Sequence, residues 1–419
     1  MKDSYEYIRI TLPYHFIKYT CIYVFLITII VIAIPSILVT SFSSISVHYD
    51  HTNNDTNAVR HKAMTADPSK QSPSTKTAAG SSKPPSMQNT EKKSAAANQQ
   101  NDSTTNNNES ISLGWIVGNG DIYNQLNNYK KLNTVSPTFA TIDKNYQVKF
   151  DLNTSTMNTL KSEHKKSWGR LIIDNDNKTN VHSFLSNAKN TENIINSVYT
   201  QASRQHIDGI NLDIENVDSN DRTLFSAFVK NLSTKLSQAN ISLSIDLPAD
   251  PKGNLNSASG FDHKLLATYC DYIIFMGYDL HWSSDPVPGP VTSLNWLEST
   301  VQEFIKTGIP AKKIILGLPA YTRIWKENSS GKVVSDPALS LSYVQQLVTQ
   351  NHRSLQWKKD LGEYYISYPA NGLQYKIWMP TAKTFNTFLS LVPKYHLAGS
   401  AVWDLNLMPS NYWNQIYAN

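Results

Sequence analysis

The 419-residue chain contains only two cysteines, Cys21 and Cys270, and the first lies in an apolar run near the amino terminus. Cysteines placed so differently predict no disulfide, so we expect a large hydrophobic core to stabilise the fold. Charge is also scarce. Charged residues make up 17% of the chain, with 38 Lys and Arg against 33 Asp and Glu. A net charge of +5 is too small to indicate binding to nucleic acid, although it suits an anionic wall or membrane surface.

The sequence lacks the spacing patterns of metal and dinucleotide sites. Four histidines have no Cys or carboxylate at ligand spacing, so we expect no metal: His263, His281, His352 and His396. Gly118-Asn119-Gly120 follows an apolar run but lacks the third glycine and the later acidic residue of a dinucleotide fingerprint. A turn is the better interpretation, and no cofactor is expected.

Only one long apolar run is present, from Thr20 to Val39. About 20 residues suffice to cross a bilayer, which predicts a transmembrane helix over residues 19–40. Lys2, Arg9 and Lys18 precede this run, and no Lys or Arg occurs from Val39 to Val59. This asymmetry places residues 1–18 in the cytoplasm and the rest outside the cell membrane. A cleaved signal peptide, and hence secretion, is the alternative, but its apolar core is usually shorter.

Residues 41–110 are rich in Asn, Ser, Thr, Gln, Ala, Lys and Pro and contain almost no large apolar residues. Such a segment cannot bury enough surface to offset the entropy of the chain, so we expect a disordered linker. A flexible chain of this length has an end-to-end distance of about 50 Å, enough to let a folded domain reach into a cell wall.

Residues 111–419 alternate apolar, β-branched runs with amphipathic helical stretches, which is typical of parallel βαβ units. The helical stretches include 193–206, 221–238, 293–307 and 381–395. Eight such units in about 300 residues predict an α/β fold, a (β/α)₈ TIM barrel with its active site at the carboxyl ends of the strands. The eight predicted strands are 113–117, 134–141, 170–174, 207–213, 241–247, 272–277, 314–318 and 398–403.

The connection between the seventh and eighth predicted strands, about 324–379, is longer than a βα loop requires. Tyr364-Tyr365-Ile366-Ser367-Tyr368 and Leu373-Gln374-Tyr375-Lys376-Ile377-Trp378 alternate like strands on either side of a Pro369-Ala370-Asn371-Gly372 turn. This pattern predicts a hairpin within a small α+β insertion.

The most informative segment is Asp208-Gly209-Ile210-Asn211-Leu212-Asp213-Ile214-Glu215. Asp213 and Glu215 are two residues apart at the end of an apolar strand, so both point to the same side. Two carboxylates on one face are costly to desolvate unless they are paired or functional. The segment therefore indicates either a catalytic site or a solvated strand end.

This segment resembles the D-G-x-D-x-D-x-E motif of glycoside hydrolase family 18, the chitinase-like barrels. Three later segments are similar to motifs of the family's sixth, seventh and eighth strands: Phe275-Met276-Gly277-Tyr278-Asp279, Leu316-Gly317-Leu318-Pro319-Ala320-Tyr321 and Ala398-Gly399-Ser400-Ala401-Val402-Trp403. The resemblance runs from about Leu113 to the end of the chain.

Finer details resemble the peptidoglycan N-acetylglucosaminidases of spore-forming bacteria, a branch related to spore cortex-lytic enzymes. Asn211 replaces the middle Asp, and Val135-Ser136-Pro137-Thr138 and Tyr278-Asp279-Leu280-His281-Trp282 are similar to that branch. The S-x-G-G that many chitinases carry on the third strand is absent, as are the LysM repeats common in the branch.

The resemblance implies substrate-assisted, retaining catalysis, in which the acetamido group of the sugar is the nucleophile. Glu215 would protonate the leaving oxygen, and Asp213 would hold the acetamido N–H and help to keep Glu215 protonated. Tyr278 would donate to the acetamido oxygen. As supporting residues, Asp208 would orient Asp213, and Asn211 would hydrogen-bond Asp213 without sharing a proton.

Asp279 would support the same sugar subsite, and Trp403 would stack under the sugar ring, because aromatic faces match the apolar faces of pyranoses. Trp282 and Tyr321 would either line neighbouring subsites or pack a loop; the sequence leaves both possibilities open.

We therefore expect a membrane-anchored, extracytoplasmic and monomeric β-N-acetylglucosaminidase whose partners are a cell-wall glycan and, through the amino-terminal helix, the lipid bilayer. Peptidoglycan is the expected substrate, and a chitin or chito-oligosaccharide hydrolase is the first alternative. The second is a non-catalytic glycan-binding barrel, which would need the aromatic residues but no proton donor.

Overall fold

The computed structural model describes residues 110–118, 121–174, 180–249, 260–350 and 354–416. The predicted cytoplasmic tail (1–18), membrane helix (19–40) and linker (41–110) lie outside the described residues, apart from Ser110 at the end of the linker. Within the part of the chain that the structure describes, no helix is both long and apolar enough to cross a bilayer.

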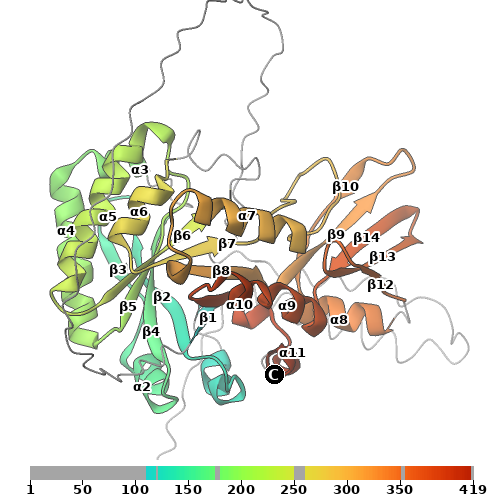
Figure 1. Cartoon of the computed structure of the whole chain (residues 1–419), viewed down its shortest axis with the longest axis horizontal. Helices are drawn as coiled ribbons and strands as arrows, with labels where there is room; N and C mark the ends of the chain where they lie inside the picture. Colours follow the sequence, from blue (N-terminus) through green and yellow to red (C-terminus); the bar gives the residue numbers. More distant parts are fainter. Residues whose placement is uncertain (1–109, 119–120, 175–179, 250–259, 351–353, 417–419) are drawn as a thin grey trace, which may run out of the picture. The chain divides into compact units, whose positions relative to one another are not determined.

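Eight parallel strands form a closed barrel (Figure 1). The ring closes because β1 pairs with both β2 and β15. All eight predicted strands overlap strands of this ring, which confirms the predicted (β/α)₈ barrel. Around the ring the strands are β1 (Ile111–Ile116), β2 (Thr134–Ile142), β4 (Lys166–Ile173), β5 (Gly209–Asp213), β6 (Ser242–Pro248), β7 (Tyr272–Met276), β8 (Ile314–Pro319) and β15 (Gly399–Trp403), with β3 (Val148–Phe150) antiparallel to β2.

Helices connect the strands, and Figure 1 shows α3, α4, α5 and α6 on the outside of β4, β5 and β6. The α-helices outside the insertion are α2 (Thr154–Ser162), α3 (Val181–Leu185), α4 (Ala188–Gln205), α5 (Arg222–Ser237), α6 (His263–Tyr269), α7 (Leu294–Lys306), α9 (Ala382–Leu389), α10 (Leu391–Tyr395) and α11 (Ser410–Ile416). In the described residues, four 3₁₀ helices accompany them: η1 (Asp121–Asn128), η2 (Ser219–Asp221), η3 (Ala311–Lys313) and η4 (Leu405–Leu407).

One predicted helix, 381–395, is two helices in the structure, α9 and α10, which meet at Ser390. The expectation of one continuous helix was therefore wrong. Pro393 explains the break, because proline has no N–H to donate and its ring clashes with the carbonyl four residues earlier in a helix interior. In the first turn of the separate helix α10 no such donor is required.

The barrel interior has an apolar layer and a polar layer. Six buried residues from five strands form the apolar layer: Leu113, Trp115, Trp168, Ile274, Ile315 and Ala401. Along β5, Ile210 and Leu212 belong to the larger core between strands and helices. Since strand residues alternate between faces, Asn211 and Asp213 point the other way, into the barrel.

The chain enters β5 through a defined turn. Asn187 caps the start of helix α4, because its side chain accepts from the N–H groups of Lys189 and Asn190. His206 follows the last turn of the helix in a left-handed conformation with φ of 56°. Gly209 then lies against Trp168 of β4, and a Cβ at this position would come within 2.7 Å of the indole. Glycine is therefore required here for β4 and β5 to pair around the buried tryptophan.

The insertion between β8 and β15 is a second sheet covered by one helix. It comprises β9 (Tyr321–Glu327), β10 (Val333–Ser335), β11 (Ala338–Ser340), α8 (Leu341–Gln350), β12 (Gln356–Lys358), β13 (Glu363–Ala370) and β14 (Leu373–Met379). The predicted hairpin is confirmed, because β13 and β14 pair antiparallel with Tyr365 opposite Trp378. Its own core joins Ile324, Ile366 and Ile377 to Val344 and Val348 of α8. The sheet begins at Tyr321, three residues before the predicted start.

Candidate functional site

Asp213 is the last residue of β5, and Glu215 follows two residues later. Both side chains are partly buried, whereas Ile214 between them is 1% exposed and belongs to the outer core. This arrangement places the two carboxylates on the inner side of the barrel, at the carboxyl end where TIM barrels carry their active sites.

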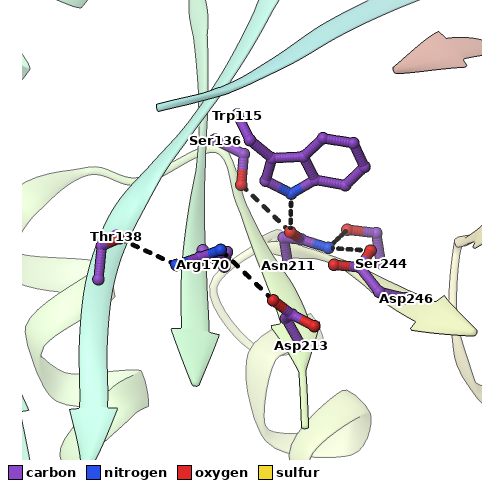
Figure 2. Close-up of polar contacts among 8 residues, drawn as sticks. All are labelled: Trp115, Ser136, Thr138, Arg170, Asn211, Asp213, Ser244 and Asp246. Carbon is purple, nitrogen blue, oxygen red and sulfur yellow. Dashed lines mark hydrogen bonds and ion pairs between the residues drawn. The ribbon is translucent and has the colours of Figure 1, made fainter. Parts of the chain in front are cut away.

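Arg170 is a buried cation that lies beside Asp213. It extends from the middle of β4 and is 2% exposed. Its Nη1 lies 3.5 Å from Asp213 Oδ2, and its Nη2 donates to Thr138 Oγ1 of β2 at 3.4 Å (Figure 2). The guanidinium carbon lies 4.7 Å from the centre of the Trp403 ring. Arg170 thus connects the predicted carboxylate with the predicted sugar platform.

Asn211 lies one layer deeper, and its side chain is fully engaged (Figure 2). Its Oδ1 accepts from Trp115 Nε1 at 2.7 Å and from Ser136 Oγ at 3.2 Å. Its Nδ2 donates to Ser244 Oγ at 3.3 Å and to Asp246 Oδ1 at 2.8 Å. These four bonds use the hydrogen-bonding capacity of the amide. The expectation that Asn211 hydrogen-bonds Asp213 is therefore wrong.

Asp208 lies at the opposite end of β5. Its Oδ2 accepts from the backbone N–H and the hydroxyl of Ser167, at 2.8 and 2.9 Å. At about 3.3 Å per residue, the five residues from Asp208 to Asp213 span roughly 16 Å. The expectation that Asp208 orients Asp213 is wrong: its contacts connect β4 to the start of β5.

Asp246, on β6, joins the site although no sequence pattern singled it out. It is 3% exposed and accepts from Asn211. Burial and then the neighbouring charge of Asp213 raise the pKa of Asp246 well above its ordinary value, with a further contribution from Glu215. The bond from Asn211 and the charge of Arg170 act in the opposite direction. The net effect is a raised pKa, so Asp246 stays protonated to a higher pH than an exposed aspartate does.

Tyr278 follows β7 and belongs to the same group of side chains. Burial raises the pKa of Tyr278 well above its ordinary value, and the charges of Asp246, Asp213 and Glu215 add to this rise. The hydroxyl consequently stays protonated and able to donate. The structure thus brings Tyr278 into electrostatic contact with both carboxylates of the motif.

Tyr321 and Asp279 form a pair beside Tyr278. The Tyr321 hydroxyl donates to Asp279 Oδ1 at 2.6 Å, and the rings of Tyr278 and Tyr321 lie 6.3 Å apart. Burial, followed by Asp279, raises the pKa of Tyr321 well above its ordinary value. Asp279 has a φ of 59°, a conformation that aspartate tolerates better than most residues. Tyr321 therefore packs at the site rather than in a remote loop.

Trp403 and Trp282 differ in how the structure holds them. Trp403 ends β15, is partly exposed and makes an edge contact with Trp115 at 5.6 Å. Trp282 lies in the loop after β7, where its carbonyl accepts from Asp285 N–H. Among the described residues, no ring contact connects the Trp282 indole with the other predicted site residues, so its place in a sugar subsite stays a prediction.

The described part of the chain contains no group of three or more His, Cys, Asp or Glu side chains arranged to hold a metal ion. The chemistry that the site offers is that of acids and hydrogen bonds: two neighbouring carboxylates, a buried acid whose pKa is raised, a phenol donor and an aromatic platform. Such groups suit the protonation of a leaving oxygen and the stabilisation of a developing positive charge.

The profile described as "Glycosyl hydrolases family 18" matches residues 95–407, which is most of the chain. The chain belongs to family 18. It is therefore a glycoside hydrolase, and the resemblance found in the sequence is confirmed. This family 18 chain is 26% identical over 322 residues to YvbX of Bacillus subtilis, described as an uncharacterized glycosylase, covering 73% of this chain and 90% of that protein.

Two further similarities extend the comparison. The chain is 23% identical over 242 residues to the cortical fragment-lytic enzyme of Bacillus cereus, which covers 56% of this chain and only 55% of that enzyme. A crystal structure of a chitinase from Chromobacterium violaceum superposes with a TM-score of 0.66 at 22% identity, covering 74% of this chain and 98% of the chitinase. The first agrees with the spore-former branch of family 18, and the second shows the fold.

Proposed function

We propose that this glycoside hydrolase is a β-N-acetylglucosaminidase that cleaves peptidoglycan glycan strands with retention of configuration. The observation that carries the proposal is the grouping of Asp213, Glu215 and Tyr278, from two strands, at the carboxyl end of the barrel. The similarity to glycosylases and a cortical fragment-lytic enzyme of Bacillus supports a wall glycan as substrate.

In the proposed mechanism Glu215 protonates the oxygen of the leaving sugar, while the acetamido oxygen of the bound sugar attacks the anomeric carbon. Asp213 accepts the acetamido N–H and stabilises the positive charge of the cyclic intermediate. Tyr278 donates to the acetamido oxygen, consistent with a hydroxyl that stays protonated. Glu215, now a carboxylate, then takes a proton from the water that opens the intermediate.

Trp403 provides the apolar surface under the sugar ring. Its ring is fixed on one side by Trp115 and contacts the guanidinium of Arg170. Tyr321 and Asp279 extend the polar side of the same subsite, since their hydroxyl and carboxylate already form a directed bond. A bound sugar would therefore meet aromatic carbon on one face and fixed donors and acceptors around its acetamido group.

Chitin is the alternative substrate, because the proposed mechanism requires only a 2-acetamido group on the sugar that is cleaved. Digestion of purified peptidoglycan and of chitin in separate reactions, followed by mass spectrometry, distinguishes the two. We expect peptidoglycan fragments that end in reducing N-acetylglucosamine. Fragments that end in reducing N-acetylmuramic acid, or release of sugars from chitin alone, would contradict the proposed substrate.

We also propose that the enzyme is anchored in the cell membrane by residues 19–40, with the barrel outside the cytoplasm. The apolar run and the distribution of positive charge around it support this placement. Removal of residues 1–41 should release an active protein into the soluble fraction, because the first barrel strand begins only at Ile111. Cell fractionation measures this, and a truncated protein that still sediments with membranes would show that another segment binds lipid.

A further inference from the structure

Asp213 requires an orienting partner, because a carboxylate that accepts the acetamido N–H must have a fixed direction. Neither polar residue of the same motif fills this role. Asn211 uses both of its amide atoms on four other side chains, and Asp208 bonds Ser167 at the far end of the strand. A charged contact does reach Asp213 from the neighbouring strand β4, and it comes from Arg170.

The position of Arg170 is determined by several elements at once. In the register of β4 and β5, Arg170 lies opposite Asn211, and Ile172 lies opposite Asp213. The Arg170 backbone is therefore two residues further from the carboxyl end of the barrel than that of Asp213. Its guanidinium contacts Asp213 and Thr138 (Figure 2). It also lies over the ring of Trp403. An arginine that contacts three other strands while 2% exposed is held in one orientation.

The surrounding charges show why a cation is needed there. Burial raises the pKa of both Asp246 and Asp404, and Arg170 opposes the rise in each. The titratable groups that interact with Asp213 or with Arg170 come from the ends of several strands: Glu215, Asp246 and Tyr278, with Asp404 after β15. Removing the guanidinium would leave several acids close together in a desolvated layer, which favours protonation of some of them.

We propose that Arg170 is a positioning residue of the active site, which keeps Asp213 ionised and aimed at the acetamido N–H and holds Trp403 beneath the same sugar. This inference rests on the proposed function, since it assigns Arg170 a part in the same reaction. Arg170 acts through Asp213 and Trp403 and touches neither the leaving oxygen nor the anomeric carbon.

The test compares Arg170→Gln, which loses the charge, with Arg170→Lys, which keeps it. The control is Arg204→Gln, because Arg204 is an exposed arginine of α4, outside the barrel and away from the strand ends. The measurements are kcat and kcat/KM of the full chain across pH, with a peptidoglycan tetrasaccharide of alternating N-acetylglucosamine and N-acetylmuramic acid as substrate, and thermal unfolding of each variant.

Arg170→Gln should lower kcat by roughly 10- to 100-fold, the size expected for loss of a bond to a charged group. The acid limb of its kcat/KM profile should move upward by about one pH unit, because an adjacent cation favours an ionised carboxylate. Arg170→Lys should keep the wild-type acid limb and recover part of kcat. Arg204→Gln should match wild type in every measurement.

If Arg170 had only a structural role, both substitutions would lower the unfolding temperature, and the acid limbs of the two variants would not differ. The inference is overturned if the acid limbs of Arg170→Gln and Arg170→Lys both match wild type, or if both shift equally. If the glutamine variant does not fold, Arg170→Lys alone decides: a shifted acid limb overturns the inference, and an unshifted limb with reduced kcat supports it. An inactive wild-type enzyme on this tetrasaccharide and on peptidoglycan would instead count against the proposed function itself.

Discussion

Glu215→Gln is expected to lower turnover of an unactivated glycan by about 10²–10⁴-fold, the usual contribution of a general acid. Glutamine has almost the same shape but cannot give a proton to the leaving oxygen, so folding and glycan binding should be preserved. Hydrolysis of the peptidoglycan tetrasaccharide measures the loss of turnover, and equilibrium binding of the same tetrasaccharide measures whether substrate affinity is preserved.

The matched control is Glu192→Gln, because Glu192 is an exposed glutamate on α4, away from the strand ends. Its turnover should equal that of wild type. If Glu215→Gln hydrolyses the tetrasaccharide at a near wild-type rate while both variants unfold at normal temperatures, another residue protonates the leaving group. The assignment of Glu215 would then be wrong.

Asp213→Asn should weaken the binding of a thiazoline analogue of N-acetylglucosamine, which imitates the cyclic intermediate, by roughly 10- to 100-fold. The analogue binds through its ring nitrogen to the carboxylate, and a neutral amide cannot provide the charge that matches the intermediate. Competitive inhibition constants of wild type and variant measure the difference, and turnover should fall in parallel.

Asp208→Asn is the matched control, since Asp208 is an aspartate of the same motif at the other end of β5. Its inhibition constant should stay at the wild-type value even where the loss of the Ser167 bond lowers the unfolding temperature. Equal loss of affinity in both variants would mean that Asp213 affects the site only through general stability.

The strands of the barrel could be predicted because their outer faces are continuously apolar and their lengths suit parallel units. The amino-terminal boundary of β4 could not be predicted from the sequence. The predicted strand began at Arg170, whereas β4 begins at Lys166 and Arg170 lies at its centre. A buried arginine is costly unless paired, and its partner Asp213 is 43 residues away in sequence, so local pattern alone gives no reason to bury it.

Asp246 was missed because its partner Asn211 is also distant in sequence, although the residue pattern of β6 does indicate its position. Ser242, Ser244 and Asp246 alternate with Leu243 and Ile245, a period of two that marks one polar face. In a parallel barrel with helices outside, the polar face can only point inward, toward the layer that contains Asn211. Alternating polar positions on several strands therefore predict an interior polar layer.

The roles expected of Asp208 and Asn211 failed because closeness in a motif was taken for closeness in space. Two residues on the same face of a strand are about 6.6 Å apart along that strand. Side chains that face each other on neighbouring strands lie closer together than this. The hydrogen-bond partners of Asn211 accordingly come from β1, β2 and β6. Arg170, which contacts Asp213, comes from β4. Only the tertiary register identifies these contacts.

Participation of the substrate's acetamido group is the central claim, and one rate series tests it most directly. The measurement is kcat/KM for aryl β-glycosides of glucosamine whose N-acetyl group carries zero, one, two or three fluorine atoms. Each fluorine withdraws electrons from the amide oxygen, so if that oxygen attacks the anomeric carbon, kcat/KM should fall at every step of the series. A rate that does not depend on the number of fluorine atoms would show that an enzyme carboxylate or water attacks instead, and would contradict the account.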